Sequence, residues 1–118
     1  MKLTALLLGV FLLGTLVAQQ KAEPQLHVVT YVDVYPNFAA DTAKYLQQFA
    51  ADSLKEGAVR FDVLRDVSRA NHFAIVEVWR NRQAYETHLG GQPNKQFREK
   101  LQMGLGSPYD ERLYNALP

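Results

Sequence analysis

The feature that most constrains the fold is a pair of strand-like segments that are apolar on both sides. Residues 26–35 (LHVVTYVDVY) and 72–80 (HFAIVEVWR) are rich in β-branched and aromatic side chains, which favour strands. Successive strand residues point to opposite faces, and in both segments apolar side chains occupy both sets of positions. A sheet made from them needs cover on each face. We therefore expect helices on one face and a second copy of the chain, in a homodimer, on the other. The alternative is a monomer with one half-buried face.

The remaining segments predict which elements surround these strands. Residues 38–56 favour a helix that Gly57 ends, and residues 58–67 alternate as a strand that forms a hairpin with residues 72–80. Asn81 can cap a short helix that stops at Gly90, Pro93 can begin another, and residues 109–117 alternate as a last strand. The expected inner face of the first helix consists of Phe38, Thr42, Leu46, Phe49 and Leu54.

The element order is β-α-β-β-α-α-β, which is typical of one α+β domain. It is the ferredoxin-like split βαβ arrangement, a four-stranded antiparallel sheet with its helices on one face. We assign the domain to residues 26–117, preceded by a linker at residues 19–25.

The first 18 residues predict a signal peptide. A short positive start, Met1-Lys2, precedes an apolar run at residues 3–17 that is too short to span a bilayer comfortably, and Ala18 offers a cleavage site. The exact cleavage position is uncertain, and an uncleaved N-terminal anchor is the alternative. We expect an exported protein, periplasmic or secreted, with no membrane attachment once the signal is removed.

The charge balance of the mature chain excludes some partners. Loss of Lys2 with the signal leaves 12 basic against 12 acidic side chains, so the domain has no electrostatic footprint for nucleic acid or anionic membrane. The chain has no cysteine, so its stability must come from packing rather than disulfides.

Residues 77–89 (EVWRNRQAYETHL) contain the residues best suited to chemistry on an aromatic molecule. Trp79 can stack on an aromatic ring and donate its indole N–H. Tyr85 and His88 lie three positions apart, hence on one side of the short helix, where His88 is the best available base. For each of these residues, simple packing in the core is the alternative.

Glu77 and Ile75 share the sheet face of Trp79, because all three alternate along one strand. A carboxylate among apolar neighbours should be paired or have a strongly shifted pKa. We expect Glu77 to form an ion pair with Arg60, Arg65 or Arg112, or else to orient Trp79 or His88. No two histidines have metal-site spacing, so we expect no metal.

Four segments together resemble the antibiotic biosynthesis monooxygenase (ABM) domain, in the branch of the quinol monooxygenases. They are HVVTYVDV, the hairpin ending RFDVLRD…NHFAIVEVW, the following QAYETHL and the closing SPYDERLYNAL. The most specific element is E-x-W at Glu77 and Trp79, followed by Tyr85 and His88-Leu89 on the next helix.

The resemblance implies a dimeric α/β barrel with a pocket between the sheet and the helices of each subunit. It implies oxidation of a small phenolic or quinol substrate by molecular oxygen, without metal, flavin, haem or other cofactor. Trp79, Tyr85, Glu77 and Ile75 would contact the substrate, with His88 and Tyr85 as the catalytic residues.

Two departures from the family pattern keep other functions open. The antibiotic-tailoring members have an asparagine four residues before the tryptophan, where this chain has Ile75, and Asn94 replaces the histidine that many relatives place after a proline. A noncatalytic, stress-response or aromatic-ligand-binding dimer is therefore the first alternative. An isomerase or haem-degrading relative, with His88 as the only candidate axial ligand, is the second.

Overall fold

The structure is a computed structural model that describes residues 23–118. The predicted signal peptide and most of the linker lie outside these described residues, so export stays a prediction. Within residues 23–118, no helix is long and apolar enough to cross a membrane.

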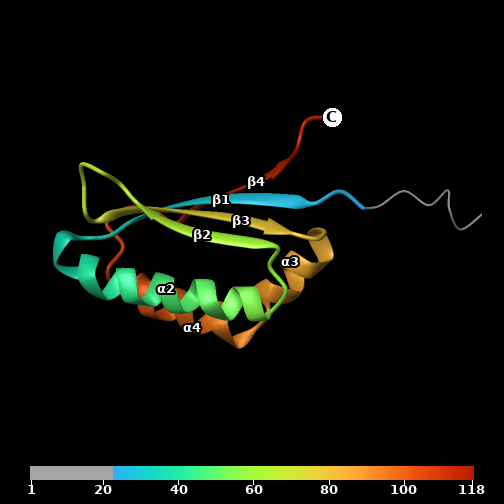
Figure 1. Cartoon of the computed structure of the whole chain (residues 1–118). Coiled ribbons are helices and arrows are strands. Elements are labelled where there is room, and N and C mark those ends of the chain that lie inside the picture. The colour runs from blue at the N-terminus through green and yellow to red at the C-terminus, as the bar shows by residue number, and fades with distance from the viewer. Residues whose placement is uncertain (1–22) are drawn as a thin grey trace, which may run out of the picture.

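Four strands form one antiparallel sheet in the order β2-β3-β1-β4. They are β1 (Leu26–Asp33), β2 (Arg60–Arg65), β3 (His72–Trp79) and β4 (Asp110–Asn115). The strongly β-branched segments β1 and β3 occupy the centre, while β2 and β4 are the edges (Figure 1). The predicted antiparallel arrangement is confirmed, with strand ends one or two residues shorter than expected.

The pairing register decides which side chains share a face. Val28 of β1 lies opposite Glu77 of β3, and Thr30 lies opposite both Ile75 of β3 and Glu111 of β4. Because directly opposed residues point to the same side of a sheet, Glu77 and Glu111 face the same way. This side of β1 and β3 is buried beneath the helices.

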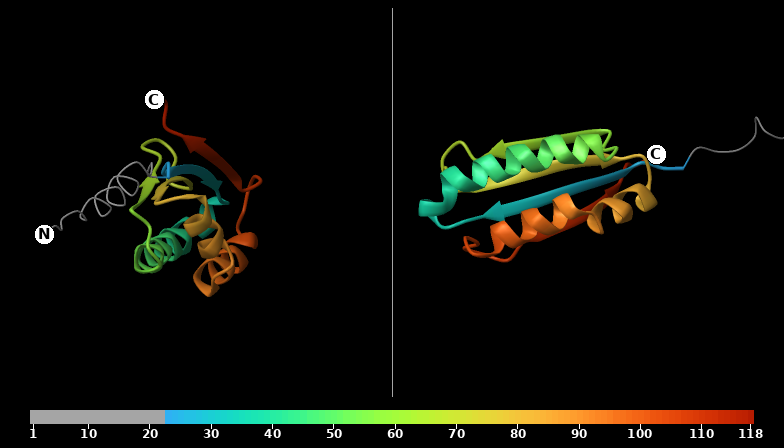
Figure 2. Two further views of the ribbon diagram at one scale, coloured as in Figure 1. Left: turned by 90° about the vertical axis from the view of Figure 1, so that its right-hand side faces the viewer. Right: turned by 90° about the horizontal axis from the view of Figure 1, so that it is seen from below.

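Three α-helices cover that face: α2 (Ala39–Lys55), α3 (Arg82–Leu89) and α4 (Gln92–Gln102). A short 3-10 turn, η1 (Pro36–Phe38), leads into α2. Seen from below, α2 and α4 lie side by side along the sheet, with α3 beside the end of β3 (Figure 2). Gly57 follows α2 with a φ of 108°, a conformation that glycine adopts at low cost, and so ends the helix as predicted.

One predicted core position of α2 is wrong. Leu54 is 49% exposed, and Ser53 is buried in its place. Ser53 lies four residues after Phe49 and therefore on the same helix face, whereas a fifth residue rotates away from the sheet. The expected Thr42, Leu46 and Phe49 are buried.

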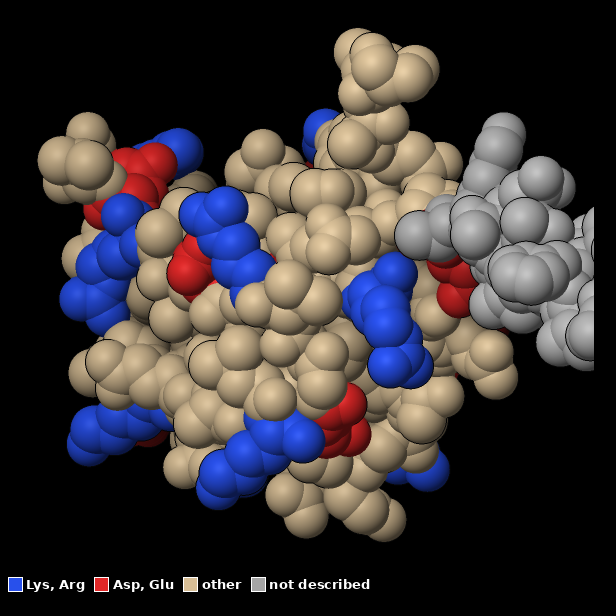
Figure 3. Space-filling model, turned by 45° about the vertical axis from the view of Figure 1, so that its right-hand side comes forward, with Lys and Arg blue, Asp and Glu red and all other residues tan. Residues whose placement is uncertain are grey.

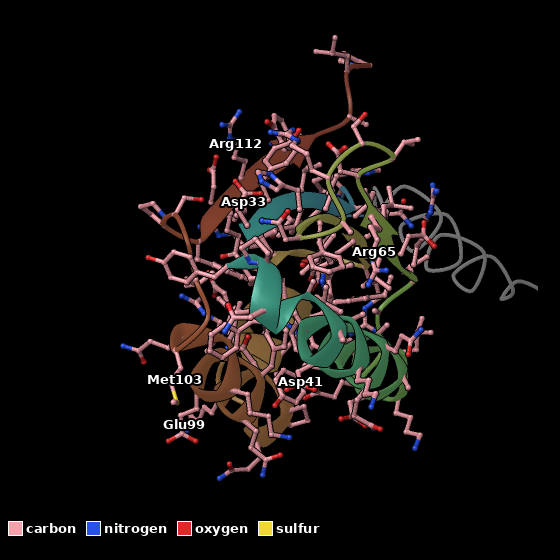
Figure 4. The ribbon with its side chains drawn as sticks, turned by 90° about the vertical axis from the view of Figure 1, so that its left-hand side faces the viewer. Asp33, Asp41, Arg65, Glu99, Met103 and Arg112 are labelled. Atoms are coloured by element: carbon pink, nitrogen blue, oxygen red, sulfur yellow. The ribbon has the colours of Figure 1, made fainter. Side chains whose placement is uncertain are left out.

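The opposite face of the sheet has no helix over it within residues 23–118 (Figure 1). Side chains from β1 and β3, such as Val29 and Val76, are half-buried there, and Tyr31 and Leu64 are about half exposed. Figure 4 shows Arg112 extending from this side, while Glu99 lies on the far side of α4. The single chain thus leaves open the face for which the sequence predicts a second copy.

Candidate functional site

The centre of the candidate site is a hydrogen bond between two neighbours on the inner face of β3. The Trp79 indole Nε1 donates to Oε1 of Glu77 at 2.9 Å, and the exposed fractions of the two side chains are 0% and 2%. The predicted ion pair of Glu77 with an arginine is wrong: Arg60 pairs with Asp62 and Arg112 with Asp110. Arg60 and Arg112 lie on strand positions that face away from the helices, so they cannot reach an inward carboxylate. Arg65 lies opposite Phe73 on the inner face, and its guanidinium carbon is 5.1 Å from the centre of the Phe73 ring.

Burial raises the pKa of Glu77 to about 7, the nearby Glu111 carboxylate raises it less, and the hydrogen bond from Trp79 opposes both. The predicted strong shift of this carboxyl group is therefore present. A carboxyl group with this pKa can take or give a proton near neutral pH, which a solvated glutamate cannot.

Tyr85 comes from α3, whose position is fixed by its N-terminal cap. The side chain of Asn81 accepts a hydrogen bond from the Ala84 backbone N–H at 2.8 Å, as the sequence predicts. Tyr85 is 2% exposed, and its hydroxyl forms no hydrogen bond of good geometry within the described part of the chain, although the Glu111 carboxylate lies close enough to interact with it. Burial, and next this hydrogen-bonding contact with Glu111, raise the pKa of Tyr85 well above its usual range. This phenol is hence a neutral hydrogen-bond donor, and Glu111 is an acceptor near it.

His88 lies in the same interior, on the predicted side of α3, but its contacts differ from those of Tyr85. Its ring stacks against Trp79 at a centroid distance of 4.5 Å and against Phe49 at 5.4 Å. Its Nδ1 lies 3.0 Å from Oε1 of Glu56, the residue that follows α2. The sequence did not indicate this partner. The imidazole that we considered as a base or haem ligand thus has one nitrogen near a carboxylate and two aromatic rings packed close to it.

Ile75 completes the predicted set and is fully buried between its strand neighbours. The structure therefore brings together all five residues predicted for the site: Ile75, Glu77, Trp79, Tyr85 and His88. Each is at most 2% exposed, so the cluster is closed to solvent in the single chain.

Sequence reasoning missed three residues of the same cluster: Thr30, Tyr109 and Glu111. Glu111 is half-buried opposite Thr30, and Thr30 is fully buried with its hydroxyl near the Tyr109 side chain. Burial raises the pKa of Tyr109, and the charges of Glu111 and Glu77 add to the effect. Alternation along the last strand would have put Tyr109 and Glu111 on one face, but only the pairing register shows that this face is the inner one.

The cluster approaches solvent at Tyr109. A cavity of about 810 Å³ lies along α4 and the segment before β4, with Tyr109 and Leu105 in its wall. The Arg98 guanidinium carbon sits 3.7 Å from the centre of the Tyr109 ring. Tyr109 and Arg98 therefore stand between this open cavity and the buried carboxylates.

The face of the molecule shown in Figure 3 carries no concentration of one charge. On the face shown in Figure 3, basic and acidic side chains are scattered among uncharged residues. No group of three or more histidine, aspartate or glutamate side chains in residues 23–118 has the arrangement of a metal site.

The sequence profile of the family described as antibiotic biosynthesis monooxygenase matches residues 25–100, well over half of the chain. The match includes β1, β2, β3 and α3, hence every residue that we predicted for the site. No curated protein matches the sequence.

Solved structures share the fold over nearly their full length. A protein from Pseudomonas aeruginosa is 20% identical, with a TM-score of 0.77 over 84% of this chain and 100% of that chain. A Nitrosomonas europaea protein, provisionally named an antibiotic biosynthesis monooxygenase, is 17% identical, with a TM-score of 0.76 over 83% of this chain and 95% of that one. Another structure with that activity in its name is 17% identical, with a TM-score of 0.75 over 79% and 99% of the two chains. At such identities these structures establish the fold.

Proposed function

This chain belongs to the antibiotic biosynthesis monooxygenase family, and from that premise we propose that it oxidises a small phenol or quinol with molecular oxygen, without a cofactor. Family membership supports a monooxygenase-type function. The observation that carries the finer proposal is the buried Glu77, with a pKa of about 7, bonded to Trp79.

Oxygen in its triplet ground state reacts slowly with closed-shell organic molecules, so the substrate itself must become the electron donor. A phenol does so once it has lost its hydroxyl proton, because the anion can pass an electron to oxygen. The protein must supply an apolar slot, a proton acceptor and a donor that stabilises the anion.

Glu77, Tyr85 and Trp79 meet these three needs. In its ionised form Glu77 accepts the substrate proton, and the Tyr85 hydroxyl, which is buried near Glu111, donates to the resulting anion. The Trp79 ring forms the wall of the slot against which the substrate stacks. With Nδ1 already facing Glu56, His88 is better placed to hold Trp79 than to take the proton.

The overall reaction balances without any further reagent. A quinol and one oxygen molecule give a hydroxyquinone and one water: one oxygen atom enters the ring, and the other leaves with the two hydroxyl protons. The substrate is oxidised by four electrons and oxygen is reduced by the same number.

The closed cluster must open for substrate to bind. The route that needs the least rearrangement passes Tyr109, which already borders the large cavity along α4. Local motions that admit a substrate and then exclude water are common in enzymes.

Oxygen uptake with a panel of phenols and quinols tests the proposal. We expect the wild-type protein to consume oxygen with at least one of them and to place one atom of oxygen-18 gas in the product. Glu77→Gln should lower kcat by about 100-fold or more, as loss of a general base does. Glu86→Gln, at an exposed glutamate of α3, is the control and should leave the rate unchanged.

The noncatalytic alternative has its own supporting observation. Ile75 puts an apolar side chain on the site face where the antibiotic-tailoring members have an asparagine, and it is fully buried. If aromatic ligands raise the melting temperature while no quinol supports oxygen uptake, the chain is a binding protein and the monooxygenase proposal fails.

A further inference from the structure

The core contains three oxidisable rings, and each lies beside a carboxylate. The indole N–H of Trp79 donates to Oε1 of Glu77 at 2.9 Å, and both side chains are at most 2% exposed. Burial, and then a hydrogen-bonding contact with Glu111, raise the pKa of the Tyr85 phenol. Burial, and then the charge of Glu111, also raise the pKa of Tyr109. Inward carboxylates are costly in a core, so the repeated pairing of a ring with a proton acceptor needs a physical reason.

The same three rings form a series that leads from the core to the surface. The ring centres of Trp79 and Tyr85 are 6.3 Å apart, and Tyr109 is close enough to Tyr85 to contribute to its raised pKa. Tyr109 is half-buried and lies in the wall of the cavity of about 810 Å³ along α4. Because the rate of electron transfer falls exponentially with distance, neighbouring rings exchange an electron much faster than the two ends of the series do.

Loss of an electron makes an indole N–H or a phenol O–H a far stronger acid. An oxidised ring in a core must pass its proton to a bonded acceptor, or else keep a positive charge away from water at a high cost in free energy. Oε1 of Glu77 is already bonded to the Trp79 N–H. Burial raises the pKa of Glu77 to about 7, so its carboxylate holds a proton from the oxidised indole more firmly than a solvated glutamate does.

We propose that Trp79, Tyr85 and Tyr109 form a radical-transfer path, in which Glu77 and Glu111 accept the protons that the first two rings release on oxidation. A phenoxyl or oxygen-centred radical beside Trp79 gains one electron from the indole, and the N–H proton passes to Glu77. Tyr85 then gives an electron to Trp79 and its hydroxyl proton to Glu111, and Glu77 returns its proton to the indole.

The last step of the path brings the radical to the surface. Tyr109 gives an electron to Tyr85, Glu111 returns its proton to the Tyr85 oxygen, and the Tyr109 proton leaves into the cavity. A reductant in solution then returns one electron and one proton to Tyr109. The path thus protects the buried side chains from a radical that escapes reduction elsewhere. It requires only these rings and carboxylates, and it does not rest on the proposed function.

The titratable and charged groups around the Trp79–Glu77 pair come from every neighbouring element. They are Tyr85 and His88 of α3, Tyr109 and Glu111 from the β4 side, Glu56 at the end of α2, which contacts His88, and Arg98 of α4, which contacts Tyr109. His88 packs its ring near the Trp79 ring, whereas the indole N–H is directed at Glu77. The ionisation of Glu77 therefore determines whether the indole proton can leave.

Flash photolysis tests the first step, because Trp79 is the only tryptophan of the chain. An ultraviolet pulse at a wavelength that tyrosine does not absorb ejects an electron from the indole. Nitrous oxide and tert-butanol remove that electron and the hydroxyl radical that it forms. The visible absorption spectra of the cation radical and of the neutral, deprotonated radical differ, so the spectrum reports where the indole proton is.

We expect the wild type to give the neutral radical at about pH 8, and the cation to persist longer at about pH 5, where Glu77 is protonated. In Glu77→Gln the cation should persist at both pH values. Glu86→Gln, at an exposed glutamate of α3, is the control and should behave as the wild type does. A neutral radical that forms as fast in Glu77→Gln as in the wild type would overturn the role of Glu77.

The same records test the second step. As the Trp79 radical decays, the absorption of a tyrosine radical should grow, and Tyr85→Phe should remove this growth because phenylalanine cannot supply the electron. Tyr45→Phe is the matched control. Tyr45 is another half-buried tyrosine with a cation near its ring, since the Lys100 nitrogen lies 5.3 Å from the ring centre. Growth of the tyrosine signal that is the same in Tyr85→Phe as in the wild type would refute the path.

Ascorbate added before the flash tests the exit at Tyr109. It should shorten the lifetime of the tyrosine radical in the wild type, and this effect should be lost in Tyr109→Phe, where the radical stays on the buried Tyr85. An equal effect of ascorbate in both proteins would show that the radical leaves by another residue. If Glu77→Gln does not fold, the comparison of the wild type at the two pH values decides the role of Glu77. None of these measurements uses a substrate, so their results are independent of oxygen uptake.

Discussion

At the scale of single residues, Glu77 makes the stability of the fold depend on pH. Its pKa rises from 4.5 to about 7 on folding, so the native state holds a proton that the unfolded state has lost. Stability should therefore fall by about 3 kcal/mol as the pH rises from about 4.5 to about 7, and then level off. Glu77→Gln mimics the protonated form and should remove this loss.

Urea unfolding of both proteins at pH 5 and pH 8 checks the prediction. We expect the glutamine variant to exceed the wild type in the free energy of unfolding at pH 8, and the two to differ much less at pH 5. Equal differences at both values would mean that Glu77 is ionised in the fold throughout.

Trp79→Phe tests whether the indole is a binding surface or only core. The variant loses the N–H that bonds Glu77 and some volume, which should cost about 1–3 kcal/mol, less than the usual stability of a domain. We expect a folded protein that binds phenols more weakly by calorimetry. Loss of the donor should also raise the pKa of Glu77, because that hydrogen bond lowers it. An unfolded variant, together with a wild type that binds no phenol, would favour a purely structural tryptophan.

The sequence was sufficient to predict the residues that lie close to one another along the chain. Glu77, Trp79, Tyr85 and His88 fall within 12 positions, where strand alternation and helical spacing determine direction. Glu56 and Glu111 come from distant elements, and their contacts depend on how α2 and β4 pack, which local patterns do not encode. For this reason the arginine partner expected for Glu77 was wrong and its neighbour Glu111 was missed, whereas the alternative partner, Trp79, is the one that bonds to Glu77.

At the scale of elements, the absence of a side chain at Gly91 leaves space for the carboxylate of Glu56, which contacts His88 of α3 from the end of α2. A Cβ built on Gly91 would lie 2.6 Å from Oε2 of Glu56, whereas one on the adjacent Gly90 would meet nothing nearer than 3.7 Å. Both glycines have ordinary negative φ angles, so only the space differs. We predict that Gly91→Ala pushes Glu56 off His88 and lowers the free energy of unfolding by about 1 kcal/mol.

Gly90→Ala is the matched control and should be close to neutral. Chemical denaturation measures both variants, and the imidazole NMR signals of His88 should move in Gly91→Ala alone. Equal effects of the two substitutions would show that the Glu56–His88 contact contributes little.

Element types and their order were predictable because the periodicities are strong and the capping residues, Asn81 and Gly57, are present. The exact residues that are buried within an element were harder to predict. We predicted that Leu54 is buried because it is apolar, but the helical geometry points the smaller Ser53 toward the sheet instead. At this end of α2 the direction in which a side chain points therefore decides its burial more than its hydrophobicity does.

At the scale of the whole molecule, the sheet face without helices is the surface on which we expect a second subunit to pack. We propose that two copies pack through it, because it exposes Tyr31 and Leu64 and half-buries Val29 and Val76. Covering such a face contributes about 25 cal/mol per Å² of apolar surface. The sequence predicted this dimer from the two-sided strands, and it stays a prediction.

Leu64→Asp should convert the dimer to single chains without unfolding them. Leu54→Asp is the matched control: the two leucines are 52% and 49% exposed, but Leu54 lies on α2, away from the open face. Sedimentation velocity at micromolar concentration distinguishes them, with only Leu64→Asp shifting to the slower species. A wild type that sediments as a monomer would refute the dimer.

Strand β4 is held in the sheet by β1 alone, at an outer edge, yet it carries one of the two inward carboxylates. The inward position of Glu111 therefore depends on backbone hydrogen bonds to a single neighbouring strand. A second subunit or a ligand that covers β4 should hold this strand in the sheet, and local opening of β4 should displace Glu111 while the rest of the fold stays intact.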